Sequence, residues 1–284
     1  MGHIKNTVLI QFSKMHGLGN DFVVIDRITQ SFKLRASEIQ ALCQRRTGIG
    51  CDQLLLIEPP IRPEADFFYR IFNPDGTEVE QCGNGLRCAA QFFYDRGLGK
   101  QRQLEVDCLA GTQYCQIEAY HQVRVQMPEP CFEPADIPII AERKQDDYDV
   151  QIEGGAHYKA QILSLGNPHA IIRVAELDTL DLSRIGPALS THALFPKQAN
   201  IGFMQIIDRK TIRLRVYERG AGETLACGSN ACAAVVSGIR AGDLDAEVRV
   251  LFPQGALEVQ WTGIGHPIFM RGPVQTTFAG QFAV

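Results

Sequence analysis

The sequence predicts an α/β protein of the α+β type, with two domains that repeat one structural unit. Its 284 residues exceed the usual size of a single hydrophobic core, so two domains are expected. Each half contains a series of short apolar or alternating runs, which predict β-strands, and one strong helical pattern. Two segments that contain Cys82 and Cys227 match closely, and 227 minus 82 is 145 positions, about half of the chain.

In the first half, the strong helical pattern covers residues 84–96 and ends at Gly97, a residue type that commonly terminates helices. A shorter helix is expected at residues 37–45, with Ser37 as its N-cap. The predicted strands are residues 9–12, 22–25, 54–57, 67–72, 103–106, 114–119 and 123–127.

The pattern restarts after the proline-rich residues 127–138, which are the best candidate for a linker. Helices are expected at residues 182–190 and 229–240. The second of these is so rich in Ala, Val and Ile that we expect sheet to enclose it on most sides. The predicted strands are residues 150–153, 157–164, 170–174, 201–207, 211–217, 248–251, 257–260 and 268–270.

Charge and composition argue against several classes of function. The formal net charge is −4 and the Lys and Arg residues form no cluster, so we expect neither nucleic-acid binding nor adsorption to a membrane. No apolar run is long enough to span a membrane, and residues 1–10 lack the pattern of a secretory signal. The nine cysteines are spread along the chain, which favours free thiols in a reducing cytoplasm over a disulfide scaffold.

The repeated segment places a cysteine at the start of each strong helix. Glu78 and Glu223 are each followed by three residues, then by Cys82 or Cys227, a glycine and a small polar residue. A helix N-terminus carries unpaired N–H groups and partial positive charge, which favour a thiolate and can hold a carboxylate. Each half is therefore expected to supply an acid/base group beside an anion-binding site. The two glutamates are assigned only a structural role at the entry to the helix.

Two such thiols can invert a carbon that bears a hydrogen. An ionised thiol removes the proton from one face, and a protonated thiol delivers a proton to the opposite face. A carboxylate held by the helix N-termini stabilises the charge that develops. We therefore expect the site to lie where the two halves meet. Two other interpretations stay open. An isolated buried cysteine is usually a core residue, and two facing thiols could form a reversible disulfide in a redox or ligand-binding protein.

Four motifs, in chain order, resemble those of the diaminopimelate epimerase family, and together they span essentially the whole chain. They are Lys14 to Phe22 (KMHGLGNDF), Arg70 to Gly76 (RIFNPDG) with Cys82 to Cys88 (CGNGLRC), Gly166 to His169 (GNPH) and Tyr217 to Ser229 (YERGAGETLACGS). We find no departure among the motif residues.

The resemblance implies an epimerase that converts LL-2,6-diaminopimelate to the meso form in lysine and peptidoglycan precursor biosynthesis. It needs no pyridoxal phosphate or other cofactor, and no metal. The implied fold has two pseudo-symmetric domains, each a mostly antiparallel β-sheet wrapped around a central α-helix. Residues 1–127 with 273–284 would carry Cys82, and residues 128–272 would carry Cys227. The protein would act on this small-molecule substrate as a homodimer.

The resemblance also implies roles for the motif residues. Cys82 and Cys227 would be the two bases, and His169 and Glu218 would lie near the thiols and help to set their protonation. The backbone that would bind the reacting carboxylate belongs to Gly83, Asn84, Gly228 and Ser229. The side chains that would bind substrate are those of Asn20, Gln53, Asn73, Asn167, Asn200, Glu218 and Arg219.

These residue types suit a substrate with two carboxylates and two ammonium groups. Asn and Gln donate and accept hydrogen bonds without adding net charge, and Arg219 can hold a distal carboxylate with two parallel bonds. Simpler interpretations remain for single residues. Each Asn lies near Gly or Pro and suits a turn, His169 suits a turn as well, and Glu218 with Arg219 could be a surface ion pair. A racemase of proline or hydroxyproline is the alternative enzyme, although proline has no distal charges to satisfy.

Overall fold

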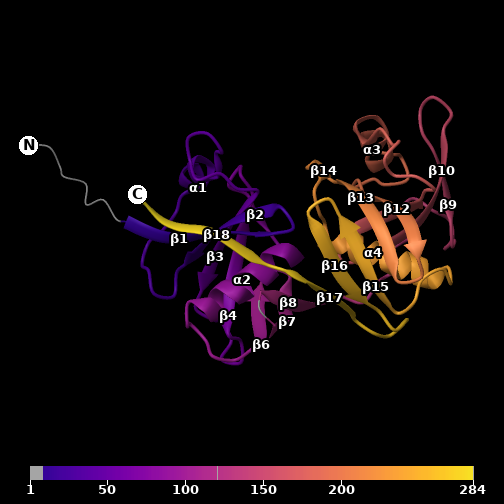
Figure 1. Ribbon diagram of the computed structural model, residues 1–284. Coiled ribbons are helices and arrows are strands. Elements are labelled where there is room, and N and C mark those ends of the chain that lie inside the picture. Colours follow the sequence, from indigo (N-terminus) through magenta and orange to yellow (C-terminus); the bar gives the residue numbers. More distant parts are fainter. Residues whose placement is uncertain (1–8, 120, 284) are drawn as a thin grey trace, which may run out of the picture. The chain divides into compact units, whose positions relative to one another are not determined.

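In the computed structural model, which describes residues 9–119 and 121–283, the chain divides into two compact units. Unit 1 joins the two ends of the sequence, Met1–Val125 and Pro273–Val284, whereas unit 2 is the continuous segment Gln126–Gly272. The C-terminal strand of the chain lies along the first strand, within unit 1 (Figure 1). The prediction that residues 1–10 contain no secretory signal falls almost wholly outside the described residues.

Unit 1 is built from mostly antiparallel strands and one long helix. Its elements are β1 (Leu9–Gly17), β2 (Asn20–Asp26), α1 (Ala36–Cys43), β3 (Gln53–Glu58), β4 (Phe67–Phe72), β5 (Glu78–Val79), α2 (Gly83–Asp95), β6 (Gln103–Cys108), β7 (Gly111–Ala119), β8 (Gln122–Met127) and β18 (Gln275–Ala283). Strand β1 pairs antiparallel with β2 and β18. Strand β2 runs parallel to β3, β3 antiparallel to β4, and β4 parallel to β6.

Helix α2 lies in the core of unit 1. Its residues 84–93 are all buried, and it contacts β1, β2, β3 and β7, so that sheet encloses most of it (Figure 1). The apolar side of the helix packs closely, since the ring of Phe93 stacks on that of Phe67 in β4 with centroids 4.6 Å apart. The helix ends before Gly97, whose φ of 68° is a conformation that favours glycine.

Unit 2 repeats this arrangement around helix α4. Its elements are β9 (Tyr148–Gln151), β10 (His157–Ser164), β11 (Pro168–Arg173), α3 (Leu182–Ser190), β12 (Asn200–Asp208), β13 (Thr211–Glu218), β14 (Gly222–Thr224), α4 (Gly228–Arg240), β15 (Glu247–Phe252), β16 (Gly255–Gln260) and β17 (Ile268–Pro273). Strand β11 runs parallel to β12, β12 antiparallel to β13, and β13 parallel to β15. Residues 230–238 of α4 are all buried, as its apolar composition predicts.

The register of the strands aligns the two units residue by residue. Before the helix, Ile71 of β4 pairs with Val79 of β5. In unit 2, Val216 of β13 pairs with Thr224 of β14, and both residues lie 145 positions later than their counterparts. The offset between the two cysteines therefore extends to the whole strand–turn–strand segment in front of each helix. Within this segment, a residue of one unit can be compared directly with its equivalent in the other.

The parallel strands of the two units are related by a slightly larger offset. Phe22 of β2 lies opposite Gln53 of β3, and His169 of β11 lies opposite Asn200 of β12. Each residue of the second pair lies 147 positions after its counterpart. Gln53 and Asn200 thus occupy equivalent positions, whereas His169 occupies a position that holds a phenylalanine in unit 1.

The predicted α+β class is confirmed, and the expected strands and helices are present with small changes in their bounds. Helix α3 has the predicted bounds, whereas β5, β14 and β18 were not predicted. The prediction that Ser37 caps α1 is wrong. The cap is Arg35, because the carboxylate of Glu38 accepts the backbone N–H of Arg35 at 2.7 Å and so starts the helix earlier.

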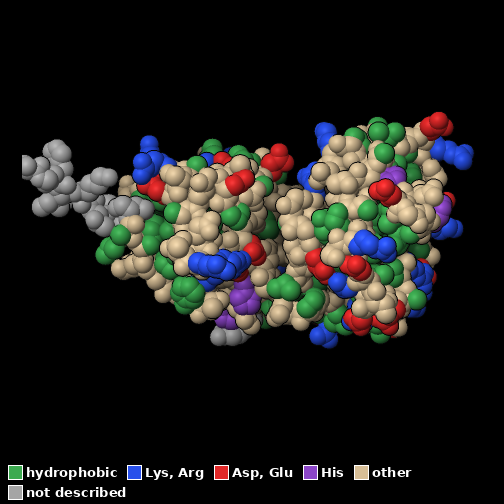
Figure 2. Space-filling view, turned by 90° about the horizontal axis from the view of Figure 1, so that it is seen from above, with side chains coloured by type: hydrophobic (Ala, Val, Ile, Leu, Met, Phe, Trp, Pro, Cys, Tyr) green, Lys and Arg blue, Asp and Glu red, His purple; other side chains and the backbone are tan. Residues whose placement is uncertain are grey.

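The surface carries charges of both signs. Figure 2 shows Lys and Arg side chains interspersed with Asp and Glu side chains on the visible faces of both units, without a large patch of one sign. Within residues 9–119 and 121–283, no helix is long and apolar enough to cross a lipid bilayer.

Candidate active site

In unit 1, Cys82 is the N-cap residue of α2. The thiol is half-buried, and its Sγ accepts the backbone N–H of Gly85 at 3.4 Å. Gly83 and Asn84 are the first two helical residues, whose N–H groups have no partner inside a helix. The sulfur therefore lies among N–H donors at the positive end of the helix dipole, a setting that favours the thiolate and the binding of an anion.

A chain of side-chain amides continues from this helix terminus. Asn84 Nδ2 donates to Asn20 Oδ1 at 3.0 Å, and Asn20 Nδ2 donates to Asp52 Oδ2 at 3.0 Å. Asn20 begins β2 and Asp52 precedes β3, so the parallel pairing of these strands brings the two residues together. Asn84 Oδ1 is buried and has no hydrogen-bond partner within the described part of the chain, which leaves it available to a ligand.

Asp52 is held by a cluster of charges behind the amides. Arg45 donates to both oxygens of Asp21, at 2.8 and 2.9 Å, and to Asp52 Oδ1 at 2.6 Å, and Lys14 forms an ion pair with Asp21 at 2.6 Å. Burial raises the pKa of Asp21, but hydrogen bonds from Arg45 and Lys14 outweigh it and hold the pKa well below its usual range. Asp21 therefore stays ionised, and Asp52, held by Arg45, fixes the orientation of Asn20.

Two further predicted binding residues of unit 1 are joined to each other. Gln53 Nε2 donates to Asn73 Oδ1 at 3.1 Å. Gln53 opens β3 and Asn73 directly follows β4, and these strands are antiparallel neighbours. Asn73 also donates to Thr77 at 3.3 Å across a turn in which Gly76 has a φ of 82°. The turn interpretation of Asn73 is therefore correct, and it does not conflict with a binding role for the same side chain.

In unit 2, Cys227 is the N-cap residue of α4 and its thiol contacts a carboxylate. Cys227 Sγ donates to Glu218 Oε2 at 2.9 Å and lies 3.4 Å from Ser229 Oγ. The other oxygen of Glu218, Oε1, accepts the hydroxyl of Thr224. Glu218 ends β13 and Thr224 ends β14, so the hairpin in front of the helix holds the carboxylate against the thiol.

The surroundings of Cys227 keep it protonated. Only 6% of the residue is exposed. Burial raises the pKa of this thiol well above its usual value, and the negative charge and hydrogen bond of Glu218 raise it further. The Ser229 hydroxyl and the backbone N–H of Asn230 act in the opposite direction without reversing the shift. At neutral pH the pair is a thiol that donates to a carboxylate.

His169 lies in β11 and is fully buried. Its Nε2 lies 2.9 Å from Asn167 Oδ1, and its ring also interacts with the Asn230 side chain. Burial lowers the pKa of His169 to about 4, the nearby side chain of Asn230 partly opposes this shift, and the charge of Arg219 acts in the same direction as burial. The imidazole is therefore neutral at physiological pH. It reaches the thiol only through Asn230, whose backbone N–H faces Cys227.

Asn200 and Arg219 form the remaining polar group of unit 2. Asn200 Oδ1 accepts the backbone N–H of Arg219 at 2.9 Å, and Arg219 Nη1 donates to the carbonyl of Lys197 at 3.1 Å. Asn200 is buried, whereas Arg219 is exposed and lies just after β13. The guanidinium is thus anchored at one end, with its other N–H groups directed at solvent or a ligand.

The structure brings most predicted site residues together within their own unit. Sequence reasoning missed three supporting residues: Asp52, which orients Asn20, Thr224, which holds Glu218, and Asn230, which contacts His169. Thr224 and Asn230 belong to the repeated segment or directly follow it. The repeat at an offset of 145 positions identifies that segment, but it does not show which of its side chains support the site. Asp52 carries no local signal, because its role depends on strand pairing.

Comparisons with known proteins give a family match and a shared fold. The model of the family described as "Diaminopimelate epimerase" matches residues 12–132 and 162–277. A PhzF-family phenazine biosynthesis protein of Bacillus anthracis has a TM-score of 0.68 at 18% identity, covering 98% of this chain and 100% of its own. A probable proline racemase of Agrobacterium radiobacter K84, with bound carbonate, has a TM-score of 0.71 at 15% identity, covering 97% and 93%.

A hydroxyproline epimerase of Agrobacterium vitis, with bound trans-4-hydroxy-L-proline, is also similar, with a TM-score of 0.68 at 14% identity and coverages of 97% and 93%. At these identities, the solved structures establish the common fold only. The family model goes further, because its two matched segments span most of both units. They include the residues that surround Cys82 and Cys227. The chain therefore belongs to the diaminopimelate epimerase family and is an isomerase of that superfamily.

Proposed function

We propose that this chain interconverts LL- and meso-2,6-diaminopimelate without a cofactor, as a step toward lysine and peptidoglycan precursors. The observation that carries the proposal is the matched pair of thiols, Cys82 and Cys227, each at the N-terminus of the buried helix of its unit. Inversion of one carbon requires two acid/base groups, because one proton leaves from one face and another arrives on the opposite face.

The different surroundings of the thiols support opposite protonation states. Cys227 holds its proton against Glu218. In unit 1 the position 145 residues before Glu218 is Asn73, a neutral amide. We therefore assign Cys82 as the thiolate that takes the α-proton, forming S–H as C–H breaks. Cys227 then gives its proton to the opposite face of the same carbon. The two protonation states are exchanged after one turnover, which readies the enzyme for the reverse reaction.

The polar residues suit the charged groups of this substrate. The N–H groups of Gly83, Asn84, Gly228 and Ser229 would bind the carboxylate on the reacting carbon and stabilise the negative charge that spreads into it. Arg219 would hold the distal carboxylate. The side-chain oxygens of the amide residues and Glu218 would accept hydrogen bonds from the ammonium groups. A substrate without the distal groups would leave these donors and acceptors unpaired, which opposes its turnover.

The test is turnover of LL-diaminopimelate in deuterated water. We expect meso product that carries deuterium at the inverted α-carbon. Replacement Cys82→Ala or Cys227→Ala is expected to lower the rate by about 100- to 10,000-fold, because each removes one acid/base group. Matched controls are Cys88→Ala and Cys232→Ala, which change buried cysteines inside the same two helices and should leave the rate near that of the wild type.

Three outcomes would contradict the proposal. Full activity of Cys227→Ala would exclude the two-base mechanism. Faster turnover of L-proline than of LL-diaminopimelate would make the chain a proline racemase, in line with the fold it shares with such an enzyme. A requirement for oxidised thiols, seen as loss of activity on adding a reductant, would instead support the redox interpretation.

We also propose that the protein acts as a homodimer in the cytoplasm, as the family resemblance implies. The long strand β18 pairs with β1 and has mostly exposed residues, none of them charged. An uncharged exposed strand is a surface that another chain can cover. Sedimentation equilibrium should give twice the mass of the 31.5 kDa chain, and a monomer at micromolar concentration would contradict this proposal.

A further inference from the structure

Each unit contains an arginine–glutamate pair at the same place in front of its cysteine. Arg70 Nε and Nη2 donate to the two oxygens of Glu78, both at 2.7 Å. In unit 2, Arg215 Nε donates to Glu223 Oε1 at 2.9 Å, and its Nη2 lies 2.8 Å from the same oxygen. Arginine and glutamate are eight residues apart in both cases, and each residue of the second pair lies 145 positions after its counterpart.

The strand register explains why the pairs form. Glu78 of β5 lies opposite Phe72 of β4, two residues beyond Arg70, so the ion pair runs diagonally across one face of the two strands. In unit 2, Glu223 of β14 lies opposite Tyr217 of β13, two residues beyond Arg215. The two hairpins thus share their register and their cross-strand ion pair, although the turns between the strands differ in sequence.

Each pair joins the two arms of the hairpin that serves the thiol. The incoming strands β4 and β13 lead directly to Asn73 and end at Glu218, respectively, the polar side chains predicted to bind substrate. The outgoing strands β5 and β14 end three residues before Cys82 and Cys227, respectively. They contain only two and three residues, so few backbone hydrogen bonds hold them. The ion pair therefore adds a side-chain link between the arms, beside the hydrogen bond from Thr224 to Glu218 in unit 2.

We propose that Arg70–Glu78 and Arg215–Glu223 are positioning pairs, each of which fixes the thiol of its own unit relative to the polar residue of the same hairpin. The proposal rests on the epimerase function proposed above and adds four residues to it. None of the four touches the reacting carbon. They act by holding the arm that leads to Cys82 against the arm that leads to Asn73, and Cys227 in its contact with Glu218.

The environment of the pairs agrees with positioning rather than with a large contribution to global stability. The four side chains are all partly exposed, from 23% for Glu78 to 42% for Glu223, and such ion pairs stabilise a fold only slightly. Their geometry is nevertheless well defined. Arg70 lies over the ring of Phe72 at 4.9 Å, and Arg215 Nη1 also donates to the carbonyls of Leu177 and Leu180 at 3.0 Å.

The test uses the full chain with Glu78→Gln and Glu223→Gln, which keep the size of each side chain and remove its charge. The first readout is the rate at which iodoacetamide alkylates each cysteine, followed by peptide mass spectrometry. We expect Glu78→Gln to increase the rate at Cys82 several-fold and to leave Cys227 unchanged. Glu223→Gln should do the reverse. This selectivity for one unit distinguishes positioning from general loosening of the fold.

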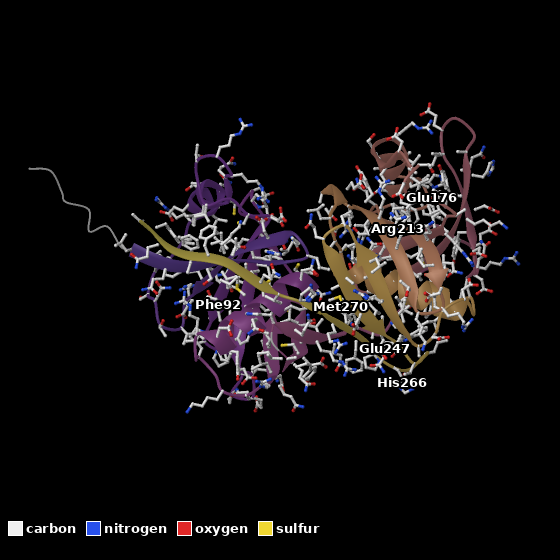
Figure 3. All side chains as sticks on the ribbon, in the orientation of Figure 1. Phe92, Glu176, Arg213, Glu247, His266 and Met270 are labelled. Carbon is white, nitrogen blue, oxygen red and sulfur yellow. The ribbon has the colours of Figure 1, made fainter. Side chains whose placement is uncertain are left out.

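The second readout is kinetic. With LL-diaminopimelate as substrate, kcat should fall by about 10- to 100-fold with KM changed by less than about 3-fold, because the thiols are displaced while the binding groups remain. Matched controls are Asp178→Asn and Asp107→Asn. Asp178 pairs with Arg213, which lies on β13 beside Glu176 (Figure 3), and Asp107 pairs with Arg62 of unit 1. Neither control ion pair joins the two arms of a hairpin, so both variants should behave as the wild type.

Should a glutamine variant not fold, Arg70→Lys and Arg215→Lys keep the charge but lose the two guanidinium contacts with the carboxylate, and we expect the same selective increase in alkylation. Equal alkylation rates in wild type and folded variants would overturn the proposal, as would an increase at both cysteines at once. The alkylation readout needs no substrate. If the wild type fails to turn over diaminopimelate, the proposed function fails while the positioning proposal is still decided.

Discussion

At the scale of single residues, one substitution between the repeats separates the two half-sites. Asn73 and Glu218 occupy equivalent positions in front of their helices, yet Asn73 hydrogen-bonds Gln53 and Thr77 whereas Glu218 accepts the thiol of Cys227. Because Asn73 carries no charge, the helix N-terminus sets the protonation state of the thiol in unit 1. In unit 2 the carboxylate of Glu218 keeps the proton on the thiol of Cys227. In the mechanism that we propose, the repeat thus yields one acid and one base from the same architecture.

His169 gives a prediction on pH and stability. Its pKa of about 4 in the folded protein lies below its ordinary value of 6.5, so the unfolded chain binds an extra proton between these values. Its contribution to stability is complete above pH 6.5 and is lost as the pH falls toward 4. Between pH 7 and pH 5 the loss should be about 2 kcal/mol of the free energy of unfolding of unit 2.

The measurement is urea unfolding followed by the fluorescence of Trp261, the single tryptophan, which is buried in the same unit as His169. His169→Gln should remove about 2 kcal/mol of the pH dependence between pH 7 and pH 5. His266 is exposed in unit 2 (Figure 3), so His266→Gln should leave the pH dependence as in the wild type. Identical pH profiles for wild type and His169→Gln would show that the histidine is not buried in its neutral form.

The residues of the site divide into those the sequence reveals and those it does not. The repeated segment identifies Cys82, Cys227 and the glycines that follow them. The resemblance to the family motifs identifies the amide residues of the predicted site. The state of Cys227 could not be predicted, because it depends on a contact with Glu218 nine residues away and on complete burial. A helix N-terminus alone predicts a lowered pKa for a thiol, whereas the carboxylate and the desolvation reverse it.

At the scale of elements, periodicity located the strands and helices but not the short connections. Strands β5 and β14 have two and three residues, too few for an alternating pattern, and yet they carry Glu78 and Glu223. Strand β18 is rich in Thr, Gln and Gly with most residues exposed, so no buried face marks it in the sequence. The N-cap of helix α1 is Arg35 rather than Ser37, because the carboxylate of Glu38 reaches the backbone N–H of Arg35, a contact that the sequence pattern does not show.

At the scale of the whole molecule, the two units differ in how the chain builds them. Unit 2 is one continuous segment, whereas unit 1 needs the last strand to return from the far end of the sequence. Strand β18 pairs with β1 along the length of that strand, and Val274 in front of it is fully buried. The ring of Phe278 packs edge-on against Phe12 with centroids 5.9 Å apart. Unit 1 therefore cannot fold completely until the C-terminal strand is present, whereas unit 2 does not contain that strand.

A chain that ends at Gly272 should consequently lose unit 1 and keep unit 2. Removal of Val274 and the aromatic residues of β18 costs about 5 kcal/mol or more from buried apolar surface, which is comparable to the whole stability of a domain, about 5–15 kcal/mol. Hydrogen exchange followed by mass spectrometry should show unprotected peptides throughout residues 9–119 and protected ones in α4. The urea midpoint of Trp261 fluorescence should stay near that of the full chain. Protection retained in α2 would show that β18 is not required, and early loss of the Trp261 signal would show that unit 2 depends on unit 1 for its stability.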